Sequence, residues 1–359
     1  MSRILLALVM MFVHAMCCVA FATERIVLVA GGGTSAAGPA KDARLVAPFG
    51  IDFDKGGNAF LVELSGGRVL KIDSKGTLAT IGGSDEKGGD GDGGPAKDAT
   101  FNGMHSLAIA LDGKVYLADT WNNRVRTYDP KSGKIAAFAG TGERGYSGDG
   151  GPAAKAKFGG IYSVAFDAAG KNLVLADLDN RRIRKIELAS GIVTTVAGNG
   201  EKGVPADGAV AAKAPLVDPR AACFDSTGNV YVLERSGNAL RVVSPEGKIR
   251  TVAGTGKAGA TGDGGEALKA TLSGPKHLCA DRDDNIVIAD TENHLVRKYL
   301  VKEGKIVRLA GSGKKGTAGI DGPPLAAELN QPHGVYLHPS GELYIVDSSN
   351  NRVLKIAKD

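Results

Sequence analysis

The hexapeptide Gly-Asp-Gly-Gly-Pro-Ala occurs at residues 91–96 and again at residues 148–153. Three degenerate copies follow, and the aspartates of the five copies are separated by 57, 58, 56 and 58 residues. These aspartates are Asp92, Asp149, Asp207, Asp263 and Asp321. A constant spacing of this size indicates one supersecondary unit that is copied along the chain. The chain is therefore expected to fold as an array of similar units.

Each unit contains four short apolar runs with period-two alternation, which is the pattern of β-strands. In the second unit we expect strands at residues 106–111, 115–119, 124–129 and 134–139. Asp112-Gly113 and the stretch from Trp121 to Asn123 supply turn residues between them. No helical periodicity of useful length is found, so the sequence predicts an all-β protein.

In the first five units, the fourth apolar run ends in Ala-Gly or Gly-Gly. A sixth copy, residues 25–31, stands alone near the N-terminus, while the last unit, residues 332–358, stops after its third strand. We therefore expect a six-bladed β-propeller with four antiparallel strands per blade, whose last blade is closed by the N-terminal strand. Such closure leaves no terminal edge unpaired.

The last unit carries Pro332-His333-Gly334-Val335, then a strand ending in Val346-Asp347, then Asn351-Arg352-Val353. This pattern resembles the NHL repeat, and the Gly-Asp-Gly-Gly-Pro-Ala linker is similar to that of bacterial and teneurin-type NHL propellers. The resemblance implies one propeller domain at residues 23–359. Its blades are expected at about residues 47–83, 104–140, 161–198, 219–254, 275–311 and 332–358 plus 24–31. Because NHL propellers include binding modules and enzymes, the resemblance leaves the function open.

The first 22 residues have the pattern of a secretory signal peptide: Arg3, an apolar stretch from Ile4 to Val13, and Ala20-Phe21-Ala22 as a cleavage site. A retained anchor, or lipidation at Cys17 or Cys18, is the alternative. No later segment has the roughly 18 apolar residues that a membrane span requires. We expect a secreted, periplasmic or cell-envelope protein that acts as a monomer.

The composition narrows the choice of partners. The net charge is +5, but lysine and arginine are spread through every unit, without the basic cluster and interleaved aromatics that nucleic-acid binding requires. Protein, peptide or anionic glycan partners are therefore expected, and nucleic acid is not.

Cys223 and Cys279 occupy the same place in neighbouring units, where a disulfide would need Cα atoms within about 7 Å. We expect two buried free thiols.

Several motifs that look chemical have structural interpretations. Gly-x-Gly-x-x-Gly occurs four times, but a dinucleotide site needs a helix after the motif, and here another glycine-rich loop follows. The Asp-Gly repeats could bind calcium, yet each lacks the later bidentate glutamate of an EF-hand. Repetition favours turns and linkers in both cases.

The informative positions are those at which the units differ. One residue after the start of the first strand, the six units place chemically unlike side chains, with spacings of 56, 57, 58, 56 and 57 residues. These ring residues are Phe49, His105, Tyr162, Arg220, Lys276 and His333. Because the first strand of a blade is innermost, we expect the ring residues to gather at one mouth of the central channel, where loops from every blade converge.

The ring contains two cations and no carboxylate, which favours an anionic ligand over a divalent cation. The leading hypothesis is a binding module that holds an anionic group or a peptide at this mouth. The alternative is a metal-dependent lyase or hydrolase at the same mouth. A third hypothesis is an assembly role for the blade rims.

The metal-dependent alternative comes from a second resemblance. Met104-His105-Ser106 and Pro332-His333-Gly334 are similar to strand starts of amidating-lyase propellers, which implies zinc held by three histidines. His105 and His333 supply two of these, and His277 is the only candidate for the third, although strand alternation would aim it differently. Lactonase-type propellers use calcium, but their ligands are carboxylates and amides, which the ring lacks. Zinc or calcium remains possible, no other cofactor is expected, and no catalytic residue is assigned.

Overall fold

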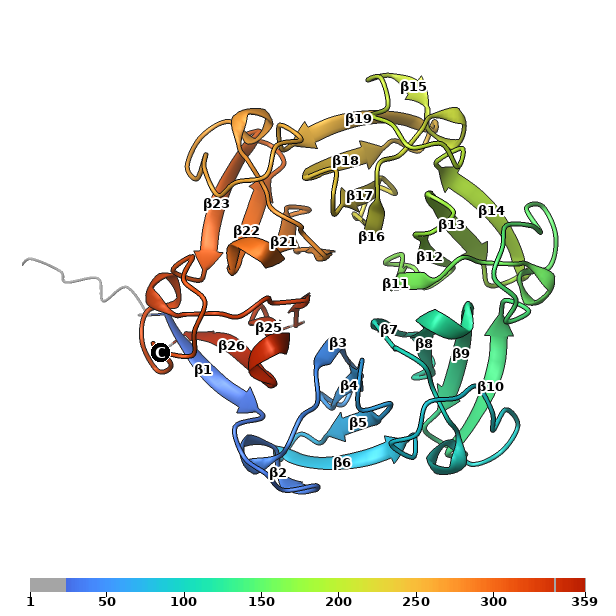
Figure 1. Cartoon of the computed structure of the whole chain (residues 1–359), viewed down its shortest axis with the longest axis vertical. Coiled ribbons are helices and arrows are strands. Elements are labelled where there is room, and N and C mark those ends of the chain that lie inside the picture. The colour runs from blue at the N-terminus through green and yellow to red at the C-terminus, as the bar shows by residue number, and fades with distance from the viewer. Residues whose placement is uncertain (1–23, 339, 359) are drawn as a thin grey trace, which may run out of the picture.

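Short apolar runs between glycine and asparagine turns form the strands of six antiparallel sheets arranged around a common centre (Figure 1). The computed structural model describes residues 24–338 and 340–358. The inner strands are β3 (Pro48–Phe53), β7 (Ser106–Ile109), β11 (Ile161–Phe166), β16 (Pro219–Phe224), β20 (His277–Ala280) and β24 (Gly334–Leu337). The second strands are β4 (Ala59–Glu63), β8 (Val115–Asp119), β12 (Asn172–Asp177), β17 (Val230–Glu234), β21 (Ile286–Asp290) and β25 (Leu343–Asp347).

The third strands are β5 (Val69–Ile72), β9 (Arg124–Asp129), β13 (Arg182–Glu187), β18 (Ala239–Val243), β22 (Leu295–Leu300) and β26 (Arg352–Lys358). The outer strands are β6 (Thr77–Gly82), β10 (Lys134–Ala139), β14 (Ile192–Ala197), β19 (Lys248–Ala253), β23 (Lys305–Ala310) and β1 (Glu24–Ala30). Two-residue strands, β2 (Gly38–Pro39) and β15 (Ala209–Val210), add a fifth strand to the first and fourth blades. The predicted four-stranded blade is otherwise confirmed.

The chain ends close the ring as the sequence predicts. β1 pairs antiparallel with β26, with Ile26 opposite Ile356, so the N-terminal strand completes the last blade. Ile26 is fully buried. The signal-peptide prediction concerns residues 1–22, which lie outside the described residues. Within the described part of the chain, there is no helix of the length and hydropathy needed to cross a bilayer.

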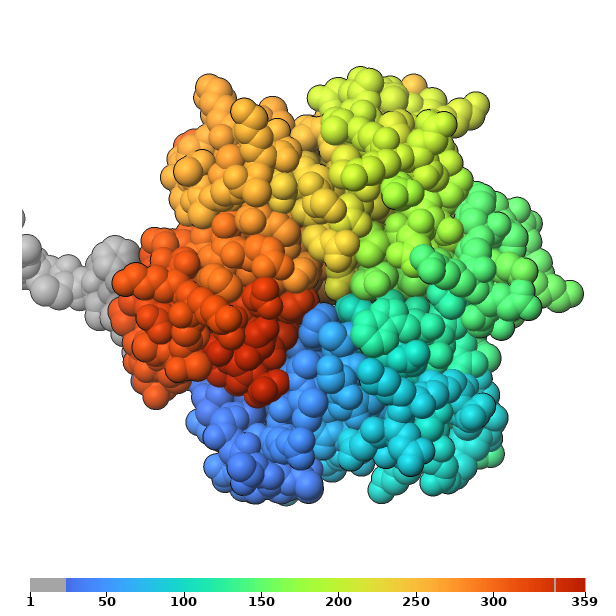
Figure 2. Space-filling model, viewed as in Figure 1, coloured from blue at the N-terminus to red at the C-terminus, as the bar shows by residue number. Residues whose placement is uncertain are grey.

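The hydrophobic core is divided among the blade interfaces. Each of six buried clusters draws its side chains from two adjacent blades, for example Ile51 and Tyr344 in the cluster that joins the first blade to the last. The other clusters join the remaining neighbours in order. Figure 2 shows the blades in the same radial order, meeting around the centre of the visible face. This packing holds the inner strands as a rigid frame.

The repeated linkers form short 3-10 turns that pack under the outer strands. The turns are η1 (Ala40–Asp42), η2 (Ala96–Asp98), η4 (Ala153–Lys155), η5 (Ala211–Lys213), η6 (Ala267–Lys269) and η8 (Pro324–Ala326). Three further turns, η3 (Thr120–Asn122), η7 (Thr291–Asn293) and η9 (Ser348–Asn350), join second to third strands. The linker aspartate Asp92 accepts a hydrogen bond from the fully buried Arg126 at 2.9 Å, and Asp149 and Asp263 bind Arg184 and Arg297 in the same way. These carboxylates are thus partners of buried arginines.

Candidate ligand site in the central channel

The ring residues converge at one mouth of the channel. The Phe49 ring lies 4.1 Å from the His333 ring and 5.1 Å from the His105 ring, measured between centroids. His105 contacts Tyr162 at 4.5 Å, and the Arg220 guanidinium carbon lies 4.3 Å from the Tyr162 centroid. Five inner-strand positions from five blades therefore form one continuous contact chain.

A bulge in three of the inner strands explains how Phe49, Tyr162 and Arg220 reach the channel. The pairing between first and second strands shifts by one residue at Phe49, Tyr162 and Arg220. A bulged residue has no direct partner on the neighbouring strand, and the bulge redirects its side chain. The same local backbone therefore presents a phenyl, a phenol or a guanidinium, according to the blade.

The two ring histidines are held as neutral imidazoles. Nδ1 of His105 lies 2.7 Å from the Gly103 carbonyl oxygen, and Nδ1 of His333 lies 2.8 Å from that of Gln331. A carbonyl can only accept, so Nδ1 carries the proton and Nε2 remains an acceptor. Burial, followed by the positive charge of Arg220 for His105 and of Lys276 and Arg220 for His333, lowers the pKa of both imidazoles well below its usual value.

Arg220 is a buried cation that has no carboxylate partner in the described structure. Its side chain is 4% exposed, its Nη1 donates to the Tyr162 carbonyl oxygen at 3.4 Å, and its buried Nε has no hydrogen-bond partner. The nearby Asp218 is already paired with Arg235 at 2.8 Å. Burial lowers the pKa of the Arg220 guanidinium to about 9. Buried charges are ordinarily paired, which sets Arg220 apart from the other buried arginines.

Lys276, the second ring cation, is neutralised by a neighbour. Its Nζ lies 2.8 Å from Oε1 of Glu292. Burial lowers the pKa of the Lys276 ammonium, while the Glu292 contact opposes that shift. The uncompensated positive charge at this mouth is therefore centred on Arg220.

His277 does not join the two ring histidines in a metal-binding group. Its Nδ1 accepts the Val335 backbone N–H at 3.4 Å, which links the fifth blade to the sixth. Burial, then the charge of Arg220, lowers the pKa of His277 to about 4. No three His, Cys, Asp or Glu side chains in residues 24–338 and 340–358 are arranged to hold a metal ion. A zinc site of three histidines does not fit this geometry.

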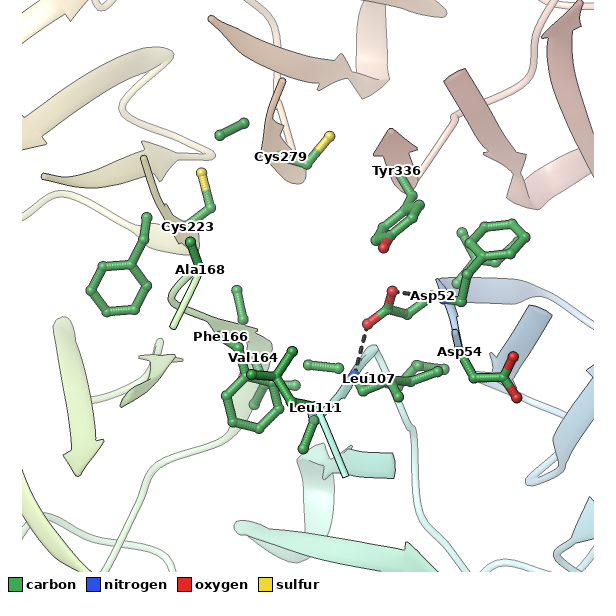
Figure 3. A pocket seen from close by; sticks show the side chains of 18 of the residues that line it. Asp52, Asp54, Leu107, Leu111, Val164, Phe166, Ala168, Cys223, Cys279 and Tyr336 are labelled. Carbon is green, nitrogen blue, oxygen red and sulfur yellow. Dashed lines mark hydrogen bonds between the residues drawn. The ribbon is translucent and has the colours of Figure 1, made fainter. Parts of the chain in front are cut away.

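A cavity of about 750 Å³ occupies the opposite end of the channel. It is lined by the C-terminal halves of the inner strands and by the turns that follow them, and none of the six ring residues lines it. Figure 3 shows Asp52, Tyr336, Cys223 and Cys279 on one part of its wall and Leu107, Val164 and Phe166 on another. The channel thus has a closed mouth with cations and an open mouth with a cavity.

Asp52 is the polar centre of the cavity wall. Its Oδ2 accepts the Ile109 backbone N–H at 2.7 Å, its Oδ1 accepts the Phe53 N–H at 2.7 Å, and Tyr336 also binds its carboxylate. Burial raises the pKa of the Asp52 carboxyl to about 6. The sequence analysis predicted neither Asp52 nor Tyr336 as a site residue.

The two cysteines are free thiols, as expected, and both line the cavity, but only Cys223 is buried, whereas Cys279 is partly exposed. Burial raises the pKa of Cys279 to about 12 and raises that of Cys223 well above its usual value. They follow their ring residues by three positions, as Asp52 follows Phe49 and Tyr336 follows His333. The repeat spacing could therefore have identified this second level of the channel.

Comparisons with known proteins agree with this architecture. The family model described as NHL repeat matches residues 272–299 and 329–356. The chain is 25% identical, over 77% of its length and 27% of the relative's, to the chloroplastic protein SUPPRESSOR OF QUENCHING 1 of Arabidopsis thaliana. It is 25% identical to human NHL repeat-containing protein 2, over 72% of this chain and 39% of that protein.

The chain thus spans well under half the length of these curated relatives. Among solved structures, a Bacteroides thetaiotaomicron protein of unknown function superposes with a TM-score of 0.70, at 16% identity, over 94% of this chain and 76% of that one. At such identity the likeness concerns the fold alone. The last two blades thus carry NHL repeats, within a six-bladed β-propeller that the N-terminal strand closes.

Proposed function

We propose that this protein is an exported binding module that holds an acidic group of a peptide or protein partner at the channel mouth formed by the ring residues. The observation that carries the proposal is Arg220, a buried guanidinium with an unpartnered Nε and no ion pair among residues 24–338 and 340–358. A ligand carboxylate would supply the partner, since guanidinium and carboxylate form charge-assisted hydrogen bonds of matching geometry. Export is proposed from residues 1–22 of the sequence.

The neighbours of Arg220 favour a peptide over a sulfated glycan. His105 and His333 keep Nε2 as an acceptor, which suits a peptide N–H and repels a second anionic oxygen. Trp121 contacts His105 at 5.7 Å and is 45% exposed, so it offers aromatic surface beside the mouth. Aromatic and arginine side chains are the groups that most often dominate peptide and protein binding.

A basic hollow beside the mouth would attract the same kind of partner. It measures about 290 Å³ and is lined by Arg144, Arg181, Lys202 and Arg235 against two carboxylates, Asp179 and Asp218. Both carboxylates are already paired, with Arg144 at 2.9 Å and Arg235 at 2.8 Å. The excess positive charge would steer an acidic partner toward Arg220.

The test is calorimetric titration of a tri-glutamate peptide into the wild-type protein, Arg220→Met and Lys131→Met. Lys131 is an exposed lysine in the turn between β9 and β10, so its replacement makes the same charge change at another place. We expect binding to wild type and to Lys131→Met, and at least a tenfold loss in Arg220→Met. Equal affinity in all three proteins would reject the proposal, and tighter binding of a sulfated disaccharide would reject the choice of a peptide.

A further inference from the structure

The cavity at the open end of the channel has mainly apolar walls. Leu107, Ile109, Val164, Phe166 and Phe224 line it, and Leu111, at its rim, is 58% exposed. Figure 3 shows Leu107, Leu111, Val164 and Phe166 grouped on one side of the cavity. Its volume of about 750 Å³ lies within the usual range for small-ligand pockets.

The carboxylate of Asp52 lies in the same lining, beside the strand of Leu107, whose Ile109 N–H it accepts (Figure 3). It accepts hydrogen bonds from Phe53 N–H, Ile109 N–H and Tyr336. A carboxylate has about four acceptor positions, so one remains for a ligand. No cationic side chain of the described residues pairs with it, although an ionised carboxylate in such surroundings needs one.

The groups around Asp52 leave its charge uncompensated. Tyr336 faces it from β24, and the thiol of Cys279 lies near it on β20. The strand β3 continues into Asp54 and Lys55, and Asp112 belongs to the turn after β7. The lining holds five further aspartates and two cations: Asp54, Asp112, Asp225, Asp281 and Asp284, with Lys55 and Arg282. Lys114 pairs with Asp112 and Lys298 with Asp281, which leaves an excess of carboxylates. The open mouth therefore has the opposite charge to the ring.

We propose that this cavity is a second binding site, which takes a ligand with a protonated primary amine on a small apolar body. The ammonium group would bind the free acceptor position of Asp52, and the body would cover the apolar wall. The inference does not rest on the anion site, because no ring residue lines the cavity.

The pH dependence of such binding follows from Asp52. Burial raises the pKa of its carboxyl to about 6, so the group is ionised at pH 7.5 and mostly protonated at pH 5. A protonated carboxyl offers no negative charge to an ammonium group. Amine binding should therefore weaken as the pH falls through 6.

The probes are n-hexylammonium chloride, hexan-1-ol and sodium hexanoate, titrated calorimetrically into the full protein. At pH 7.5 we expect hexylammonium to bind at least tenfold more tightly than hexanol, and hexanoate more weakly than hexanol. At pH 5 the affinity for hexylammonium should fall about tenfold, as expected for one carboxyl with a pKa near 6, while that for hexanol stays constant. Absence of hexylammonium binding, or binding that is indifferent to pH, would overturn the inference.

Two variants distinguish binding of the ammonium group by Asp52 from its attraction by the aspartates at the rim of the cavity. Asp52→Asn should abolish the preference for hexylammonium over hexanol, whereas Asp112→Asn, which removes the same charge from the rim, should change it less than twofold. If Asp52→Asn does not fold, the pH dependence of the wild type still decides the matter. Arg220→Met should keep full amine binding, so failure of the anion site and failure of this site are distinguishable. An equal loss of the preference for hexylammonium in Asp52→Asn and Asp112→Asn would show that the aspartates at the rim merely attract the cation, and would contradict the proposal.

Discussion

Arg220 on β16 and Asp52 on β3 are opposite charges on opposite blades, and neither forms an ion pair with a described residue (Figure 1). Arg220 belongs to the closed mouth and Asp52 to the cavity at the open mouth. The other buried arginines of the blades are paired with carboxylates, as Arg126 is with Asp92 and Arg241 is with Glu234. The two unpaired charges therefore distinguish the channel from the frame that surrounds it, and such exceptions cluster at functional sites.

The linker aspartates should act as ion-pair partners. Asp92→Ala is expected to lower the free energy of unfolding by about 3 kcal/mol, because it leaves the fully buried Arg126 with Asp119 at 3.7 Å as its only carboxylate. Urea unfolding measures this loss. Addition of calcium should leave the melting temperature of the wild type unchanged, and a rise in that temperature would favour calcium binding by the linkers.

Closure by the N-terminal strand should contribute strongly to stability. Ile26→Ala removes a fully buried side chain of β1 and should cost about 3 kcal/mol. Val27→Ala, on the half-buried side of the same strand, should cost less than about 1 kcal/mol. Chemical denaturation of both variants checks the difference, and equal small effects would mean that β1 adds little to the ring.

Phe49 should keep water away from the ring histidines. Phe49→Ala removes a ring that contacts both His105 and His333, so their imidazoles become more hydrated and their pKa values should rise toward the ordinary value near 6.5. Titration of the histidine ring protons by NMR measures this change. Unaltered titration of both histidines would show that burial by Phe49 is not the cause of the shift.

His277 should make stability depend on pH. Its pKa is lowered to about 4 in the folded protein, so between pH 6.5 and 4 the unfolded chain binds the proton more readily. The wild type should therefore lose up to about 1.4 kcal/mol per pH unit relative to His277→Asn as the pH falls through this window. Guanidinium unfolding of both proteins at pH 7 and pH 5 measures this difference in the free energy of unfolding. A gain in stability of the wild type relative to His277→Asn at pH 5 would contradict the prediction.

The sequence was sufficient for the architecture because the fold repeats. The spacing of Asp92, Asp149 and their equivalents predicted the repeat. The isolated strand at residues 25–31 and the incomplete last unit predicted six blades and their closure, which the pairing of β1 with β26 confirms. The same spacing aligned the ring residues, and a bulge places three of them, Phe49, Tyr162 and Arg220, at equivalent points of their inner strands.

The lack of an ion pair at Arg220 could not be predicted, because it depends on the pairing of Asp218 with Arg235. The spacing of the repeats does not indicate such a side-chain contact. The ion pair between Lys276 and Glu292 could not be predicted for the same reason. The fifth strands β2 and β15 were also missed, since two-residue strands carry no period. Tyr336 was not predicted, because it lies three positions after the ring residue His333 and belongs to no motif of its own.

If Arg220 is an unpaired buried cation that binds an anionic ligand, thermal unfolding of Arg220→Met must show it. Without ligand, the variant should melt at or above the temperature of the wild type, because a buried charge is replaced by an apolar side chain of similar length. Tri-glutamate should raise the melting temperature of the wild type and leave that of Arg220→Met unchanged. A variant that melts well below the wild type, and that the peptide stabilises to the same extent, would contradict the account.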